Sequence, residues 1–389
     1  MMDIKEVAEK YKDYQIEMRR YFHTHPEIST KEFNTSDVVK KELDKIGVQW
    51  RKCGLETGVL ATIKGAKSGK TILIRGDMDA LTVKEETGLP FASQNEGVMH
   101  ACGHDCHISM MLTAAHILND MKGELCGTVQ LAFQPAEETA QGAKAMIEDG
   151  ALEGVDGCFA IHVWSGIDKG HISVEAGPRM ASADQFMIDV VGKGGHGATP
   201  DMCIDAAIAS CEIVNNLQTI ISREIAPMDP AVITVGTVQV GTRWNVIAER
   251  GHLEGTTRCF SREVWKELPE RMERIAKQTA SAFRTEATLN YIRLVPPVIN
   301  NQKIAELAQA ASKKVVSPDA PILSPATAGG EDFAFFMEKV PGAVALLGVR
   351  NEACGAVWPQ HSGKYCVDEE ALLHGAMLYA QMAMDFNAQ

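Results

Sequence analysis

Two patterns of apolar and polar positions divide the chain into three stretches. In residues 1–179 and 294–389, short apolar runs alternate with longer segments whose apolar side chains recur at helical spacing. Short apolar runs that alternate with helices are typical of a mostly parallel sheet covered by helices on both faces. The two outer stretches therefore predict one α/β body whose parts are separated in the sequence.

The middle stretch, residues 180–293, follows a different order. Strand-like (β) and helix-like (α) segments follow one another as β-α-β-β-α-β, at 184–191, 204–225, 231–240, 251–260, 263–283 and 285–294. This order is the split βαβ pattern of a ferredoxin-like domain. Proline and glycine interrupt the pattern at 176–178 and 295–297, which predicts hinges at both ends. We expect residues 180–293 to form a separate domain inserted into the body.

Three apolar runs of the body end in polar residues. The runs at 71–75, 129–133 and 157–161 are followed by Asp77, Asp79, Glu137, Glu138 and His162. Each has an ordinary structural explanation when taken alone, since acids complement the first turn of a helix and aspartates are common in turns. Taken together, they suit an open α/β sheet, in which side chains at strand ends form the binding site.

Residues 99–107 concentrate groups that bind metals: His100, Cys102, His104, Asp105 and His107. Imidazole and thiolate are the usual ligands of zinc and its neighbours. The segment alone leaves a structural and a catalytic site open, because no paired Cys-x-x-Cys or His-x-x-x-His spacing dominates it. The adjacent glutamates favour catalysis, since one carboxylate can bind a metal while the other takes a proton from water that the metal acidifies.

Composition narrows the class of protein. The 389 residues predict about two to three domains, and the formal net charge of −13 argues against nucleic acid or an anionic membrane as partner. Ten cysteines without regular spacing suit a reducing compartment. The start of the chain carries no apolar run, and no stretch approaches the roughly 20 apolar residues that span a bilayer. We therefore expect no signal peptide, no membrane segment and a cytoplasmic location.

Motifs spread over nearly the whole chain give it a family resemblance. They lie at 19–23, 26–27, 75–81, 99–107, 133–138, 143–147, 194–197, 245–247, 330–333 and 361–362. In this order they resemble the M20 peptidase group of metal-dependent amidohydrolases. The resemblance is closest to the branch of hippurate hydrolases, N-acyl-L-amino-acid amidohydrolases and auxin-conjugate hydrolases. It implies hydrolysis of N-acyl-L-amino acids to a carboxylic acid and a free amino acid, in a catalytic body with an inserted lid and dimerisation domain.

The resemblance also implies a metal centre. It implies two divalent ions per subunit, zinc or manganese in first place and cobalt or nickel otherwise. The implied ligands are Cys102, which bridges the two ions, and His104, Glu138, His162 and His361. Glu137 becomes the general base, and Asp79 orients a ligand histidine. The other polar groups of residues 99–107 are then structural, with a small chance of direct ligation for His107.

Substrate contacts are expected from the inserted domain. By resemblance, His196 polarises the scissile carbonyl, often in a neighbouring subunit's site, and Asn245 contacts the substrate. A homodimer or higher homo-oligomer follows from such a role. Arg258, at a strand end, is a candidate for binding the substrate carboxylate through two parallel hydrogen bonds. The alternatives are an incidental histidine in a glycine-rich turn, a turn asparagine and a solvated arginine.

Two other functions remain open from the sequence. One is a dipeptidase or aminobenzoyl-glutamate-type hydrolase of the same group, and the other is a metal-binding protein without catalysis. The presence of Glu137 and of every implied ligand argues against the second. The chain departs from the family at Gly76, Thr82 and Ala248, which are backbone or packing positions. Trp358, close to His361 in sequence, leaves the choice of acyl group open.

Overall fold

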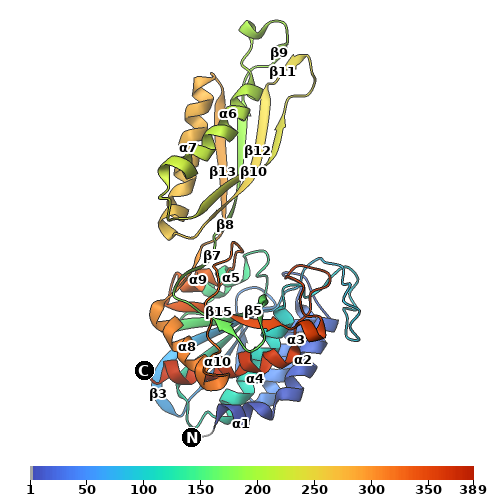
Figure 1. Cartoon of the computed structure of the whole chain (residues 1–389), viewed down its shortest axis with the longest axis vertical. Helices are drawn as coiled ribbons and strands as arrows, with labels where there is room; N and C mark the ends of the chain where they lie inside the picture. Colours follow the sequence, from blue (N-terminus) through green and yellow to red (C-terminus); the bar gives the residue numbers. More distant parts are fainter. Residues whose placement is uncertain (1–2) are drawn as a thin grey trace. The chain divides into compact units, whose positions relative to one another are not determined.

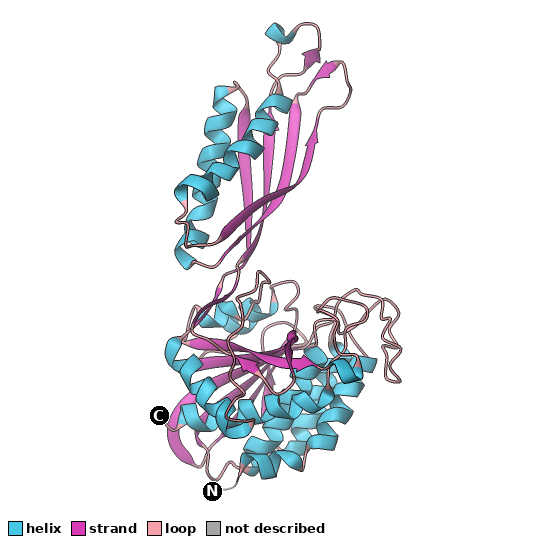
Figure 2. Cartoon of the chain, in the orientation of Figure 1, coloured by secondary structure: helices cyan, strands magenta, loops and turns pink. Residues whose placement is uncertain are grey.

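The computed structural model describes residues 3–389, which divide into two compact units (Figures 1 and 2). The first unit contains residues 3–177, Ile299–Pro325 and Asp332–Gln389, and the second contains Pro178–Val298 and Ala326–Glu331. Each unit has its own cluster of buried apolar side chains. Residues 1 and 2, which begin the segment expected to lack a signal peptide, lie outside the described residues.

A mixed sheet forms the centre of the first unit, with strand order β1-β2-β4-β3-β5-β15-β6 in the described residues. Its four inner strands are parallel: β4 (Cys126–Gln134), β3 (Lys67–Asp77), β5 (Gly157–Asp168) and β15 (Gly342–Arg350). The outer strands β1 (Gln49–Lys52), β2 (Val59–Lys64) and β6 (Ile172–Ser173) are antiparallel. The expected α/β fold with a mostly parallel central sheet is confirmed.

Helices cover this sheet, and α4 is the one that positions the site. The helices are α1 (Ile4–Glu9), α2 (Lys12–Thr24), α3 (Phe33–Ile46), α4 (His104–Asp120), α5 (Gly142–Glu148), α8 (Gln302–Val315), α9 (Ala334–Met337) and α10 (Leu372–Asn387). Nearly every side chain of α4 is buried, including the polar side chains of its first turn. It packs on α2, α10 and β3. The metal-binding segment at its start is therefore held in the core.

Gly103, the residue before α4, cannot be replaced without strain. Its φ is +91°, in the left-handed region that favours glycine. A Cβ at this position would lie 2.5 Å from Val163 Cγ2 and 2.8 Å from the Tyr365 hydroxyl. Glycine thus allows the metal-binding segment to lie directly against β5.

The strand that carries His162 is longer than the predicted run of 157–161. β5 continues to Asp168, but β3 pairs with it only as far as Arg75 opposite Ala160. On its other side, β15 pairs with β5 at His162 and beyond. His162 therefore lies where β5 has lost one neighbouring strand, and its side chain is free to face the site.

The second unit is an antiparallel sheet with order β10-β12-β8-β13, covered on one face by two helices (Figure 1). The elements are β8 (Ala183–Val191), α6 (Ala206–Thr219), β10 (Ala231–Val240), β12 (Arg250–Cys259), α7 (Arg262–Ala282) and β13 (Glu286–Val295). A π-helical turn, η2 (Ile220–Glu224), extends α6. Two short strands, β9 (Gly195–His196) and β11 (Val246–Ile247), form a separate ladder. A lid or dimerisation role for this unit stays a prediction.

One part of the predicted domain division needs correction. The sequence places 326–331 in the second part of the body, but the structure groups these residues with the second unit. The Thr327 N–H donates to the Arg179 carbonyl at 2.9 Å, and Thr327 accepts from the Ala181 N–H at 3.1 Å. These bonds add the segment to β7 (Gly177–Met180), which pairs with β14 (Val298–Asn300) where the chain passes between the units. Such a pairing leaves no periodic signal in the sequence.

Candidate metal centre and active site

Asp79, just after β3, organises the turn that carries the two glutamates. Its carboxylate accepts the backbone N–H groups of Glu137 and Glu138, each at 3.1 Å, and the Ser29 hydroxyl at 2.6 Å. The turn begins at Ala136, a non-glycine residue with φ of +54°. Such a conformation costs free energy and persists only where the surroundings enforce it. Asp79 therefore holds the adjacent glutamates in a fixed turn.

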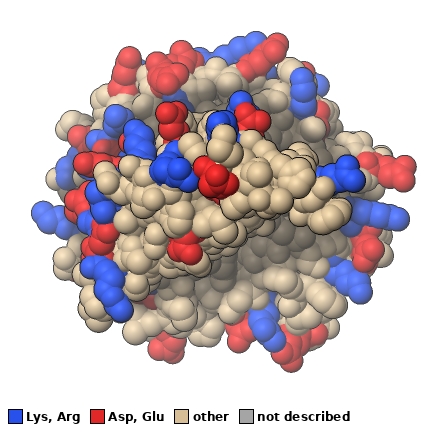
Figure 3. Space-filling model, turned by 90° about the horizontal axis from the view of Figure 1, so that it is seen from above, with Lys and Arg blue, Asp and Glu red and all other residues tan. Residues whose placement is uncertain are grey.

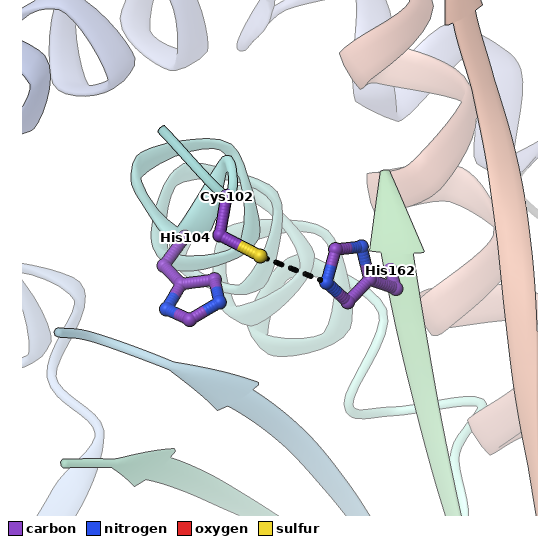
Figure 4. Close-up of side chains that lie close together, drawn as sticks. All are labelled: Cys102, His104 and His162. Carbon is purple, nitrogen blue, oxygen red and sulfur yellow. Dashed lines mark hydrogen bonds between the residues drawn. The ribbon is translucent and has the colours of Figure 1, made fainter. Parts of the chain in front are cut away.

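His104 and His162 each direct one ring nitrogen toward Cys102 (Figure 4). The Nδ1–H of His104 donates to the Asp79 carbonyl at 2.8 Å, and that of His162 donates to the Val163 carbonyl at 2.7 Å. Nε2 of each ring therefore carries a lone pair when the ring is neutral, which for His104 requires the loss of a proton. His162 Nε2 lies 3.5 Å from Cys102 Sγ, and His104 Nε2 has no hydrogen-bond partner within the described residues. Burial, with His107 nearby, lowers the pKa of His162 to about 3, so its imidazole is neutral.

Two groups of donors share Cys102. One is Cys102, His104 and His162, the other is Cys102, Glu138 and His361, and within each group the donor atoms lie within 4.8 Å of one another. Glu138 Oε1 lies 4.0 Å from His104 Nε2 and 3.7 Å from His361 Nε2, and it lacks a hydrogen-bond partner among the residues described. Burial raises the pKa of both Cys102 and Glu138. Cys102, His104 and His162 are buried, Glu138 is partly buried and His361 is exposed. Thiolate, imidazole and carboxylate donors in this arrangement fit zinc and its neighbours.

Glu137 lies beside this cluster. Its side chain groups with those of His104 and Glu138, again with donor atoms within 4.8 Å of one another. The Asp332 N–H is directed at Glu137 Oε1 at 3.4 Å. The carboxylate is partly exposed, so solvent and a substrate can reach it. Position and access both suit a group that exchanges a proton with water.

His107, the remaining candidate ligand of the segment, is occupied by other partners. Its Nδ1 lies 2.5 Å from Asp77 Oδ1, and its Nε2 accepts the Val163 N–H at 3.0 Å. It can therefore form a metal bond only by losing a buried hydrogen bond, which is costly. Its contact with Asp77 instead links α4 to the end of β3.

A buried ionic network behind the site was not foreseen as a unit. The Arg75 guanidinium contacts Asp77 at 2.5 Å and Asp332 at 2.7 Å, and Gln134 Nε2 donates to both Asp332 oxygens at 2.8 Å. Burial raises the pKa of Asp77, but Arg75 and the neighbouring histidines bring it well below its usual value. A charged residue beside an apolar run indicates that a buried partner is needed, because an unpaired buried charge is costly, but it does not indicate which residue is the partner.

Asp105, the residue after His104, contacts two charged or titratable residues of the 19–23 motif. Asp105 Oδ2 lies 3.1 Å from Arg19 Nε and 2.7 Å from His23 Nδ1. His23 Nε2 in turn lies 3.2 Å from Glu85. Arg19, His23 and Asp105 are all buried. Helix α2 therefore supports the first turn of α4, where the metal ligands lie.

The three expected substrate contacts all lie in the second unit, and the structure does not bring them together there. His196 and Asn245 are neighbours, because the N–H of Gly197 donates to the Asn245 carbonyl at 3.0 Å. His196 follows the end of β8 that pairs with Arg250. Arg258 lies eight residues further along β12. At about 3.3 Å per residue, this places it ~26 Å from the His196 end of the sheet.

Within residues 3–389, no helix is both long and apolar enough to cross a membrane. On the face seen in Figure 3, basic side chains are scattered among acidic ones and form no continuous basic patch. Nucleic-acid-binding surfaces instead gather lysine and arginine on one face.

The fold and the clustered donors define a hydrolase with a metal centre at the strand ends of an α/β sheet. The chain matches peptidase family M20/M25/M40 over residues 73–385. It is 39% identical to thermostable carboxypeptidase 1 of Saccharolobus solfataricus, over 99% of this chain and 97% of that protein. It is 38% identical to an N-acetyl-L-cysteine deacetylase of Bacillus subtilis, over 96% of this chain and 89% of that protein.

A solved structure is also similar over nearly the whole chain. It is the Bacillus subtilis YXEP protein, described as a dinuclear metal binding peptidase from the M20 family. The TM-score is 0.85 at 36% identity, covering 97% of this chain and 98% of that one. The chain therefore belongs to peptidase family M20/M25/M40. It is a metal-dependent amidohydrolase, and a metal-binding protein without catalysis is no longer supported.

Proposed function

We propose that the chain hydrolyses the amide bond of N-acyl-L-amino acids to a carboxylic acid and a free amino acid. The observation that carries this proposal is the pair of donor groups that share Cys102, with Glu137 beside them. The similarity to the Bacillus subtilis deacetylase supports an N-acyl amino acid as the substrate class. Ten free cysteines support a reducing, cytoplasmic setting.

The reaction assigns a separate task to each side chain. Two divalent ions would be held by Cys102, His104, Glu138, His162 and His361, with zinc or manganese preferred and cobalt or nickel as alternatives. Such ions acidify water and polarise an amide carbonyl. Glu137 accepts the proton of the attacking water and returns it to the leaving amine nitrogen. Asp79 keeps the Glu137 backbone and the His104 ring in place for this exchange.

Residues of the second unit complete the proposed site. His196 stabilises the negative charge that develops on the carbonyl oxygen, Asn245 contacts the substrate and Arg258 binds its carboxylate. One small substrate cannot reach both ends of a sheet that places Arg258 ~26 Å from the His196 end. This separation supports a His196 that serves the site of a neighbouring subunit, in a homodimer or a higher homo-oligomer.

A second candidate is peptide hydrolysis, either of dipeptides or of an aminobenzoyl-glutamate type of substrate. The similarity to the Saccharolobus carboxypeptidase favours it. The chemistry at Glu137 would be the same, but the acyl group would carry a free amine.

A hydrolysis panel separates the two candidates. Metal-reconstituted enzyme is assayed on N-acetyl, N-benzoyl and N-indoleacetyl amino acids and on matched dipeptides, with Glu137→Gln as the blank. We expect a higher kcat/KM for at least one N-acyl series than for any dipeptide. A preference for dipeptides throughout would replace the first proposal by the second.

A further inference from the structure

The loop that carries His361 begins and ends beside a cysteine. Cys354 closes the short helix η3 (Glu352–Cys354) and is exposed, and Cys366 is partly buried. The Cys366 Sγ lies 3.4 Å from the carbonyl oxygen of Gly355, the residue after Cys354. Cys366 Sγ therefore lies beside the backbone that adjoins Cys354, while the Cys354 Sγ lies 3.5 Å from the Asn351 carbonyl at the base of the same loop.

Hydrogen bonds hold both sides of this base. Asn351 and Ala356 exchange backbone bonds of 3.1 Å and 3.0 Å, which fixes the turn that presents Cys354. The Asn351 side chain donates to Asp368 Oδ2 at 2.6 Å, and Asp368 N–H bonds to the Val349 carbonyl at 3.0 Å. One asparagine thus connects the backbone near Cys354 with the backbone that follows Cys366. Both cysteines are thus held on neighbouring segments of backbone.

We propose that Cys354 and Cys366 form a redox-active pair that closes to a disulfide when the protein meets a small-molecule disulfide such as oxidised glutathione. The exposed Cys354 loses its proton and attacks one sulfur of the small disulfide, which releases one small thiol and leaves a mixed disulfide. Cys366 then loses its proton and attacks the Cys354 sulfur, which expels the second small thiol. Two protein thiols are oxidised and one small disulfide is reduced to two thiols.

The order of attack follows from exposure. Burial and the nearby Cys354 raise the pKa of Cys366, so Cys366 is the slower first nucleophile. Among the cysteines of the described residues, Cys211 is the other exposed one, and it lies in the second unit on α6. Cys211 therefore serves as a matched control, because it is accessible and has no assigned role.

The disulfide would act on the metal centre, and this consequence rests on the proposed function. The His361 N–H bonds to the Ala101 carbonyl at 2.8 Å, which ties the loop to the metal-binding segment. Closing the base of the loop restricts the positions that His361 can reach. A restricted ligand is better organised for binding, so the oxidised protein should lose metal to a chelator more slowly, by a factor of about two or more.

Peptide mapping tests the disulfide without reference to activity. The metal-loaded full chain is incubated with oxidised glutathione, alkylated and digested with trypsin without reduction. Cleavage after Arg350 and Lys364 separates Cys354, in 351–364, from Cys366, in 365–389. We expect one species with the mass of both peptides, which dithiothreitol divides into two. Cys354→Ser and Cys366→Ser should abolish it, and Cys211→Ser should leave it unchanged.

Two results would overturn the proposal at different points. Recovery of Cys354 only as an alkylated thiol or a glutathione adduct would show that Cys354 and Cys366 do not form a disulfide. If the disulfide is mapped but the oxidised protein loses metal at an unchanged or faster rate, the disulfide does not restrict His361 as proposed. Absence of bound metal in the reduced protein would instead count against the proposed function, and the mapped disulfide would still stand.

Discussion

At the residue scale, two donors of the metal centre must lose a proton before they bind a cation. Burial raises the pKa of the Cys102 thiol. Burial lowers the pKa of His104, but Asp77 and Cys102 bring it above its ordinary value. Metal binding should therefore release protons and become tighter as the pH rises.

Proton release can be measured directly. Metal-free protein is loaded at pH 7 in weak buffer with an indicator dye, and a Cys102→Ser variant should release about one proton fewer per chain than the wild type. Cys106→Ser, in the same segment, is the control and should match the wild type. Equal release by Cys102→Ser and the wild type would remove the thiol from the set of ligands.

Residue types and spacing could predict the donors but not their surroundings. Cys102, His104 and Glu138 belong to recognisable motifs, and the structure places them together with His162 and His361. The network of Arg75 with Asp332 was not predicted. It depends on which strands are neighbours and on a contact between residues far apart in sequence. No local pattern carries that information.

At the scale of elements, α2 supports the start of α4 through a buried ion pair. Replacing Asp105 by Asn removes the charge that balances Arg19, which remains buried. Glu369, 3.3 Å from Arg19, remains as a second partner, so the loss should lie at the lower end for a broken buried ion pair. The free energy of unfolding should fall by about 3 kcal/mol. Urea unfolding of the metal-free chain at pH 7 measures this. The control is Asp120→Asn, an exposed acid on the same helix, which should cost less than about 1 kcal/mol.

The ion pair of Arg19 with Asp105 also predicts how the free energy of unfolding depends on pH. Burial raises the pKa of Asp105, but Arg19 and His23 hold it far below its ordinary value. An unfolded aspartate has a pKa of about 3.9, so the stabilisation is present above that pH and is lost as the pH falls toward the folded value. Asp105 also raises the pKa of His23, so the comparison is made below the pH range in which histidine titrates. The difference between the wild type and Asp105→Asn should shrink as the pH falls below about 4. A difference that grows between about pH 5 and pH 3 would contradict this.

The type and order of the helices and strands were more predictable than the residues at which they begin and end. Periodicity in 180–293 predicts the six main elements of the second unit with small shifts, because each has one buried and one exposed face. β5 extends past its predicted end because β15 continues to pair with it after β3 has stopped. Such an extension depends on a partner strand from the far end of the chain.

At the scale of the whole molecule, a His196 that acts in a neighbouring subunit would make each site depend on two chains. Glu137→Gln and His196→Ala variants are each expected to be nearly inactive. In mixed dimers, about half are hybrids, and one of the two sites in each hybrid contains both intact residues. Co-expression should restore about a quarter of wild-type activity.

The control is a mixture of Glu137→Gln with Glu138→Gln. It should restore no activity, because both glutamates lie in one turn of the same chain. No recovery in the first mixture would place His196 in its own subunit's site.

The central claim is that the two adjacent glutamates have different roles in one site: Glu137 exchanges a proton with water, and Glu138 binds metal. Glu137→Gln keeps every proposed ligand, so bound metal should stay at two ions per chain while kcat falls by at least about 10², the lower range for loss of general acid–base catalysis. KM should change little, because Glu137 acts on water and not on the resting substrate. Glu138→Gln, which loses an anionic ligand, should lower bound metal and activity together. The decisive measurement is kcat alongside metal stoichiometry for both variants. Loss of metal from Glu137→Gln, or a kcat near the wild-type value, would contradict the account.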